Sequence, residues 1–197
     1  MRATTISMKI NPRYHQSAEE ITSEQDYVEA AKKDPSKFGF LYDKYYNSVF
    51  RFVFQRTNDE HTSHDITSEV FFKALKNIQK YEFRGLPFSS WLLRVAQNET
   101  MTVFRNNTKS RVVKLKSDHL ENLIDEIEEN HLDDFKPQLL SVLKELKESD
   151  LQLIEMRFFE GRAFKEIAEI TEKNESAVKM KLYRVLEKLK GKLQYKI

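Results

Sequence analysis

Apolar residues recur every three or four positions along most of the chain, the spacing that aligns them on one side of an α-helix. In the first half this pattern predicts a helix from Asp26 that ends before Pro35, followed by three longer helices, the second of which should open at Thr62 or Ser63. The expected core positions of these three are Leu41, Tyr45, Val49, Phe52 and Val53, then Ile66, Val70, Ala74, Leu75 and Ile78, then Phe88, Leu92, Val95, Ala96 and Val103. Residues 1–25 show no sustained period, so we expect a flexible N-terminal arm there.

The helical pattern resumes in the second half, after an acidic stretch. One helix is predicted from Pro137, and the next begins at Ser149 or Asp150, either of which can cap it, and ends at Gly161. Two further helices follow, over 164–171 and 174–192. Their inward-facing residues are expected to be Phe164, Ile167, Ala168 and Thr171, and then Val178, Leu182, Val185, Leu186 and Leu189.

These patterns predict an all-α protein with two small helical domains. The domains should cover residues 26–107 and 136–197, joined by an acidic linker over 108–135 that is exposed and partly helical, with Leu123, Ile124 and Ile127 able to lie on a neighbour. Four glycines and four prolines in 197 residues fit long helices with few tight turns. No strand-like alternation of convincing length and no internal repeat is found.

Composition narrows the class of protein. The chain lacks cysteine, which excludes disulfides, thiolate nucleophiles and cysteine zinc sites and is typical of a cytoplasmic protein. No apolar run is long enough to cross a membrane, so we expect no membrane insertion, and the first residues do not form a signal peptide.

The net charge of +2 hides two basic blocks separated by an acidic one. Residues 73–116 carry ten basic and two acidic side chains, residues 117–135 carry eight acidic and no basic ones, and residues 136–197 carry fourteen basic and ten acidic ones. This asymmetry indicates one polyanionic partner that is contacted at two places.

The last two predicted helices have the size and spacing of a helix-turn-helix, with Asn174 as N-cap of the second helix. The face of this second helix opposite its apolar stripe carries Ser176, Lys179, Met180, Tyr183 and Arg184. Exposed Met180 can touch thymine methyl groups, and Lys179 and Arg184 can reach phosphates or guanine edges in a major groove. The alternative is an ordinary helical hairpin with a solvated basic face.

A second polar face is predicted on the helix from Phe88. Its members follow the spacing i, i+4, i+7 and i+11 and are Arg94, Asn98, Met101 and Arg105, with Trp91 on the flank. The preceding helix adds the lysines Lys73, Lys76 and Lys80. Arginine and asparagine beside aromatic rings suit single-stranded or distorted DNA, whose bases offer stacking faces. The alternative is a solvated face with Trp91 in the core.

Catalytic, metal and cofactor sites are not predicted. His61 and His64 lie beside Asp65 at a spacing that can hold a metal, but no further matched ligand accompanies them. The remaining Glu and Asp pairs lie in runs that we expect to be solvated. There is no glycine-rich phosphate loop and no nucleophile elbow, so we predict that the protein is not an enzyme.

Two stretches resemble a known family. "HDITSEVFFKALKNIQKYEFRGLPFSSWLLRVAQN" is similar to the second conserved domain of bacterial sigma factors of the extracytoplasmic-function (ECF) type, and "LKELKESDLQLIEMRFFEGRAFKEIAEITEKNESAVKMKLYRVLEKLK" resembles their fourth. The resemblance runs from about Asp26 to Lys192. It implies a protein that joins core RNA polymerase, directs it to promoter DNA and helps open the duplex, with an anti-sigma factor as a possible antagonist.

The resemblance also implies roles for individual residues. The polymerase-binding positions would be Asp65, Glu69, Phe72 and Lys76. The positions that meet the upstream end of the melted −10 element would be Lys73, Arg94, Asn98 and Arg105, and the loop from Phe83 to Phe88 would lie beside the pocket for a flipped-out base. The positions that read the −35 element would be Ser176, Lys179, Met180, Tyr183 and Arg184. The acidic linker would thread toward the RNA path of the polymerase.

This chain departs from the family pattern at the helix-turn-helix turn, where glycine is usual at the position of Glu172 and a small apolar residue at that of Lys173. If the turn requires a positive φ, Glu172 should cost about 1 kcal/mol. Thr102 and Ala177 also replace residues common in the family, aspartate and threonine. These changes affect which promoter sequence is read.

Two rival functions remain open from the sequence. A helix-turn-helix regulator that binds duplex DNA as a dimer without polymerase would explain the C-terminal half, but it leaves the face from Arg94 to Arg105 and the helix from Asp65 to Lys76 without a role. The second rival is a structural or protein-binding helical module, in which the charged side chains would only keep the surface solvated.

Overall fold

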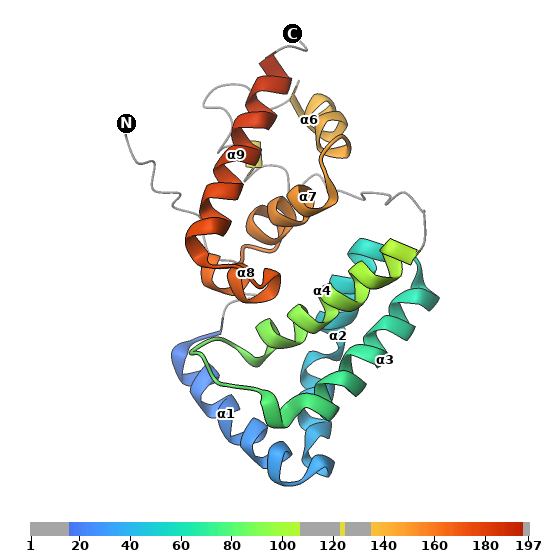
Figure 1. Ribbon diagram of the computed structural model, residues 1–197, viewed down its shortest axis with the longest axis vertical. Coiled ribbons are helices and arrows are strands. Elements are labelled where there is room, and N and C mark those ends of the chain that lie inside the picture. Colours follow the sequence, from blue (N-terminus) through green and yellow to red (C-terminus); the bar gives the residue numbers. More distant parts are fainter. Residues whose placement is uncertain (1–15, 107–122, 125–134, 195–197) are drawn as a thin grey trace. The chain divides into compact units, whose positions relative to one another are not determined.

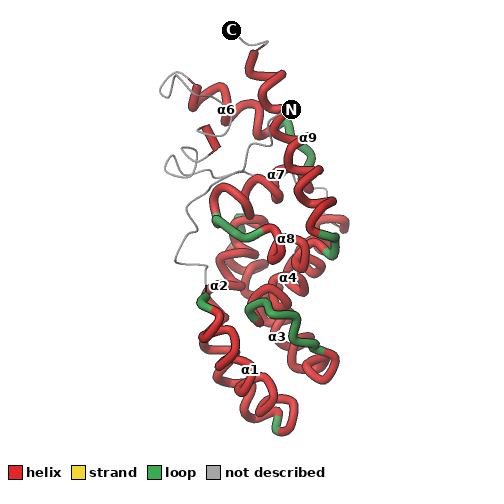
Figure 2. Tube along the Cα trace, turned by 90° about the vertical axis from the view of Figure 1, so that its left-hand side faces the viewer, coloured by secondary structure: helices red, strands yellow, loops and turns green. Residues whose placement is uncertain are grey.

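The computed structural model describes residues 16–106, 123–124 and 135–194, and every regular element in these ranges is helical (Figures 1 and 2). The chain divides into two compact units. The first unit contains α1 (Ala18–Lys33), α2 (Gly39–Thr57), α3 (Glu60–Asn77) and α4 (Phe88–Asn106), and the second contains α6 (Phe135–Lys144), α7 (Glu148–Ile154), most of α8 (Phe164–Thr171) and α9 (Glu175–Gln194). The all-α prediction with two small domains is therefore confirmed. Within the described ranges, none of the helices combines the length and the apolar character that a membrane span requires.

The core of the first unit lies between α2, α3 and α4, which run side by side in Figure 1. The five predicted core residues of α2, from Leu41 to Val53, are all buried. Most of the predicted core residues that follow, up to Ala96, are buried too, whereas Leu75, Val95 and Val103 are half-buried.

The first helix begins eight residues earlier than the sequence pattern indicated, so the predicted arm over residues 1–25 is wrong for its last part. Ser17 is the N-cap of α1 and forms a capping box with Glu20: the Ser17 hydroxyl accepts from the Glu20 N–H, and the Glu20 carboxylate accepts from the Ser17 N–H. The motif "SAEE" was therefore the missed signal. Residues 1–15 lie outside the described ranges.

The third helix also starts earlier than predicted. Asp59 caps it, because its carboxylate accepts from the Thr62 N–H at 2.8 Å, and Thr62 and Ser63 lie inside the first turn. Asn58 precedes it with a left-handed φ of 51°, which ends α2. Asparagine tolerates this conformation better than most residues do.

In the second unit, α6 and α7 pack against α9. The predicted caps Ser149 and Asp150 are wrong: α7 begins after Lys147, without a side-chain cap, and both residues lie in its first turn. A π-helical segment over Glu155–Phe159 continues α7, and Gly161 then adopts a φ of 66°, which confirms its predicted role at the end. Of the predicted linker, only Leu123 and Ile124 are described, and both are helical and buried.

The expectation that the Glu and Asp pairs are solvated is wrong in this unit. Glu160 and Glu166 are buried around Arg162, whose Nε donates to Glu160 at 2.5 Å and whose Nη1 lies 3.8 Å from Glu166. Glu166 also accepts from the Ala163 N–H at the start of α8. These carboxylates therefore hold the segment before α8 in place, since a buried charge requires a partner.

The turn between α8 and α9 has the helix-turn-helix form that the sequence predicts. Asn174 caps α9, its side-chain oxygen accepting from the Ala177 N–H at 2.7 Å. Glu172 adopts a φ of 53°, so the position that carries glycine in the family does require a left-handed backbone here.

Replacing Glu172 with glycine should therefore stabilise the turn between α8 and α9 by about 0.5–1 kcal/mol. The Cβ clash of the left-handed conformation disappears, while the greater freedom of the unfolded chain offsets part of the gain. Slower hydrogen exchange of the α8 and α9 amides would report it. Asn58→Gly is the matched control, because asparagine tolerates the left-handed φ of 51° that Asn58 adopts. This substitution should therefore change the stability of the first unit by a smaller amount. Faster exchange in Glu172→Gly would contradict a strained turn.

Candidate nucleic-acid interface

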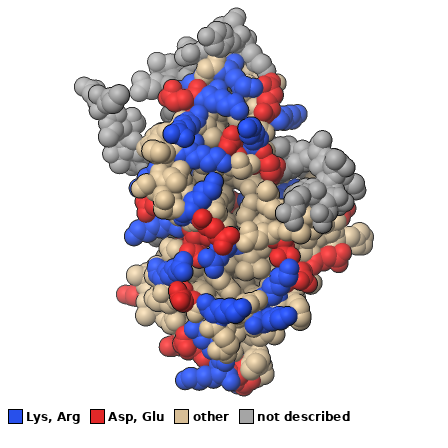
Figure 3. Space-filling view, viewed as in Figure 1, with Lys and Arg blue, Asp and Glu red and all other residues tan. Residues whose placement is uncertain are grey.

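The outward face of α9 carries the predicted −35 residues. Met180 is 57 % exposed and Tyr183 is 43 % exposed, while Ser176 and Arg184 are exposed beside them. The opposite stripe, Val178, Leu182, Val185, Leu186 and Leu189, is buried. Lys and Arg side chains follow the visible side of α9 in Figure 3, interrupted by few acidic ones. Two large apolar side chains thus lie in water within a basic surface.

The lysines on α9 differ in what they contact. Lys179 is half-buried, pairs with Glu175 at 2.5 Å and lies 5.3 Å from the Phe164 ring. The hydrogen bond from Lys179 lowers the pKa of Glu175, so this carboxylate stays ionised at neutral pH. Lys181 instead turns toward α7 and pairs with Asp150 at 3.0 Å. An i,i+4 ion pair on a helix surface, such as that of Lys179 with Glu175, is worth about 0.3–0.5 kcal/mol. A phosphate can therefore displace Glu175 from Lys179 at little cost.

The predicted −10 residues lie on one side of α4. Asn98 and Met101 are exposed and Arg94 is half-buried, at the helical spacing that the sequence indicated. Arg105 belongs to α4, but its side chain lies outside the described ones. Lys73 lies on α3 and is shared by two carboxylates, Glu99 of α4 at 2.6 Å and Glu69 at 3.3 Å.

The pair between Lys73 and Glu99 joins α3 to α4. The hydrogen bond to Glu99 is the main reason that the pKa of Lys73 is raised above its ordinary value. The ammonium group is thus held beside the α4 face in its charged form. A phosphate would compete with both carboxylates for it.

Trp91 does not flank the polar face as predicted but belongs to the core, being 7 % exposed. Its ring lies 5.4 Å from Tyr81 and 5.3 Å from Phe88, between centroids. Burial raises the pKa of Tyr81 to about 12. This aromatic cluster supports the loop that connects η2 (Ile78–Lys80) to α4, in which Gly85 has a φ of 68° and Phe83 is exposed.

The predicted polymerase-binding residues form an exposed stripe on α3. Phe72 is 60 % exposed, and Asp65, Glu69 and Lys76 are exposed on the same side. The stripe therefore combines an apolar centre with charges of both signs, which is a common composition for a protein-binding surface.

The two histidines considered as metal ligands also lie on α3. His61 is exposed, and His64 Nδ1 is 2.8 Å from the Tyr46 hydroxyl. Among the residues that the structure describes, no group of three or more potential ligands could hold a metal ion.

The sequence analysis also missed buried polar residues in the first unit, among them Glu24. Glu24 lies on the inner side of α1, in register with Val28 and Ala31, and all three are buried. Its spacing to those apolar residues was a usable signal. The predicted arm covered this position and concealed it.

Comparisons with known proteins identify both units. The model of Sigma-70 region 2 matches residues 41–110, and that of Sigma-70 region 4 matches residues 137–189, so that together they cover more than half of the chain. The ECF RNA polymerase sigma factor BldN of Streptomyces coelicolor is 29 % identical over 170 residues, which are 83 % of this chain and 63 % of BldN. The chain thus matches less than two thirds of the length of BldN.

Two further similarities agree. The ECF RNA polymerase sigma factor SigM of Bacillus subtilis is 26 % identical over 153 residues, 77 % of this chain and 91 % of SigM. The solved structure of CnrH in complex with the cytosolic domain of CnrY has the same fold, with a TM-score of 0.55 at 18 % identity, over 86 % of this chain and 96 % of that one.

Proposed function

The chain belongs to the sigma-70 family as a factor of the ECF type, and we propose that it joins core RNA polymerase, directs it to promoters and helps open the DNA. The observation that carries the proposal is the match of region 2 and region 4, in that order, to two helical units that each expose a polar face. The protein would act in the cytoplasm, where the polymerase works, and without catalytic activity of its own. An anti-sigma factor that holds the free chain is a further proposed partner.

Three surfaces would each bind a different partner or DNA element. The α3 stripe from Asp65 to Lys76 would bind the polymerase, since Phe72 offers an exposed apolar anchor. The α4 face with Arg94 and Asn98, together with Lys73, would meet the opened −10 strand. The α9 face, with Ser176, Lys179, Met180, Tyr183 and Arg184, would lie in the major groove of the −35 element.

The test is co-purification with core RNA polymerase, followed by run-off transcription from a pool of promoter fragments. Specific transcripts that require the chain would establish the function and reveal the promoter sequence. Binding of duplex DNA without any polymerase binding would instead favour the dimeric helix-turn-helix regulator.

Replacing Phe72 with alanine should weaken binding to core polymerase about tenfold. An aromatic side chain that becomes buried when a complex forms typically contributes more than 1 kcal/mol to the interface. The fold should be unaffected, since Phe72 is mostly exposed. Phe40→Ala makes the same change at an exposed phenylalanine of α2 that stacks on Tyr27, and it should leave polymerase affinity unchanged. Equal losses in both variants would argue against a specific α3 surface.

A further inference from the structure

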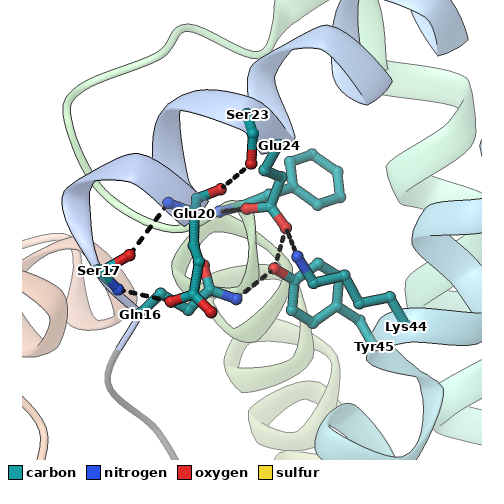
Figure 4. Close-up of polar contacts among 8 residues, drawn as sticks. Gln16, Ser17, Glu20, Ser23, Glu24, Lys44 and Tyr45 are labelled. Atoms are coloured by element: carbon teal, nitrogen blue, oxygen red, sulfur yellow. Dashed lines mark hydrogen bonds and ion pairs between the residues drawn. The ribbon is translucent and has the colours of Figure 1, made fainter.

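The carboxylate of Glu24 is the centre of a buried polar cluster that joins three parts of the first unit (Figure 4). Glu24 is 2 % exposed. One of its oxygens accepts from the Lys44 ammonium at 2.8 Å and from the Tyr45 hydroxyl, both on α2, and the other accepts from the backbone N–H of Phe88 at 2.9 Å. A single side chain of α1 therefore contacts α2 and the start of α4.

The bond to Phe88 satisfies a backbone group that α4 itself cannot satisfy. Phe88 is the first residue of α4, and the first N–H groups of a helix have no partner within it. A carboxylate is favourable at this end because the helix dipole is positive there. Burial, with the nearby charge of Glu24, raises the pKa of Tyr45 above its ordinary value, so its hydroxyl keeps the proton that it donates.

The same helix also contacts the other end of the loop that leads to α4. Gln79 in η2 donates its side-chain amide to the Lys32 carbonyl of α1, and the Lys32 ammonium lies 5.8 Å from the centroid of the Tyr81 ring. The loop over 81–87 is thus held by α1 before it begins and after it ends. Only residues beyond α1, from 41 onward, are matched by the region 2 model.

We propose that Glu24 is a positioning residue that sets the geometry of the 81–87 loop and of the first turn of α4, and thereby the capture of the opened −10 strand. The capture step rests on the proposed function, whereas the positioning step does not. Glu24 would contact no DNA itself, because it is buried.

The positioning step can be measured in the free protein. Trp91 is the only tryptophan of the chain, and its ring contacts Phe88 and Tyr81, so its fluorescence reports this location. Glu24→Gln should shift the emission of Trp91 to longer wavelength and increase its quenching by acrylamide, with the far-UV circular dichroism unchanged. Glu19→Gln is the matched control on α1, because Glu19 is exposed in the first turn of this helix. Unaltered Trp91 fluorescence in folded Glu24→Gln would overturn the proposal.

The capture step is measured on the complex with core polymerase, using a single-stranded −10 oligonucleotide as probe. Glu24→Gln should weaken oligonucleotide binding about fivefold and leave the affinity for core polymerase within about twofold. A merely destabilised unit would lose both, since the α3 stripe belongs to it. Altered fluorescence with normal oligonucleotide binding would limit Glu24 to a structural role, and failure of the unmodified chain to bind polymerase would reject the proposed function alone.

A milder variant covers the case in which Glu24→Gln does not fold. Tyr45→Phe keeps the ring against Phe88 and removes only the hydroxyl that donates to Glu24. It should change the quenching of Trp91 in the same direction by a smaller amount. A change as small as that of Glu19→Gln would overturn the proposal.

Discussion

Reversing the charge of both Lys179 and Arg184 to glutamate is expected to lower promoter-specific initiation on the order of 100-fold, with polymerase affinity within about twofold. Both residues lie on the α9 face that exposes Met180 and Tyr183. Glutamate at these positions would remove two contacts to DNA and add two negative charges beside its phosphates. Run-off transcription and polymerase co-purification measure the two effects separately.

The same double variant should also change how strongly the affinity for promoter DNA depends on salt concentration. Each lost phosphate contact lowers the slope of log affinity against log salt by about one, so the double variant should lose about two. Arg184→Glu alone should have the larger effect, because Arg184 is exposed while Lys179 already shares its charge with Glu175. An equal slope in the variant and the unmodified protein would show that these residues do not contact phosphates.

The control for net charge is the double variant Lys144→Glu with Lys147→Glu, which changes the net charge by the same amount as the α9 double variant. Both lysines are exposed at the junction of α6 and α7, away from the α9 face. This variant should keep initiation within about threefold, as expected when only long-range charge is altered. Loss of polymerase binding in the α9 variant, in contrast, would mark its outward face as a protein interface.

The helices and their buried faces could be predicted because helical spacing is a local property. All five predicted α2 core residues are buried, as are the five on α9 from Val178 to Leu189. The exposed face of α9 was predicted from the same helical spacing. Met180 and Tyr183 thus needed no structure to be singled out.

Helix starts were predicted less well, because several neighbouring polar residues can serve as N-cap and the backbone geometry decides which one does. At α7 the sequence offered Ser149 and Asp150, yet the helix begins after Lys147, which provides no side-chain cap. At α1 the capping box of Ser17 and Glu20 was present in the sequence but lacked a recognisable apolar period behind it.

Contacts between residues distant in sequence could not be predicted from spacing at all. Lys73 meets Glu99 across α3 and α4, and Glu24 meets the Phe88 N–H from another helix. The same limit explains Trp91, since only the packing of Tyr81 and Phe88 around it decides that it is buried. The candidate faces were therefore predictable, but the contacts that hold them in place were not.

Replacing Asn98 with aspartate is expected to reduce opening of the −10 element on the order of 50-fold, while binding of duplex −35 DNA stays normal. The substitution keeps the shape of the side chain but removes its two donor hydrogens and adds a negative charge. Asn98 is exposed on α4, so the fold should tolerate the change. Permanganate reactivity of unpaired thymines measures the opening, and a −35 duplex probe measures the other step.

Asn98 is a sharper test than Trp91, although both were candidates from the sequence. Truncating buried Trp91 to alanine would cost about 3–5 kcal/mol of stability and abolish many properties together. Asn47→Asp is the matched control, because it makes the same isosteric change at an exposed site of α2. Normal opening in Asn98→Asp would exclude the Asn98 side chain from capture of the −10 strand.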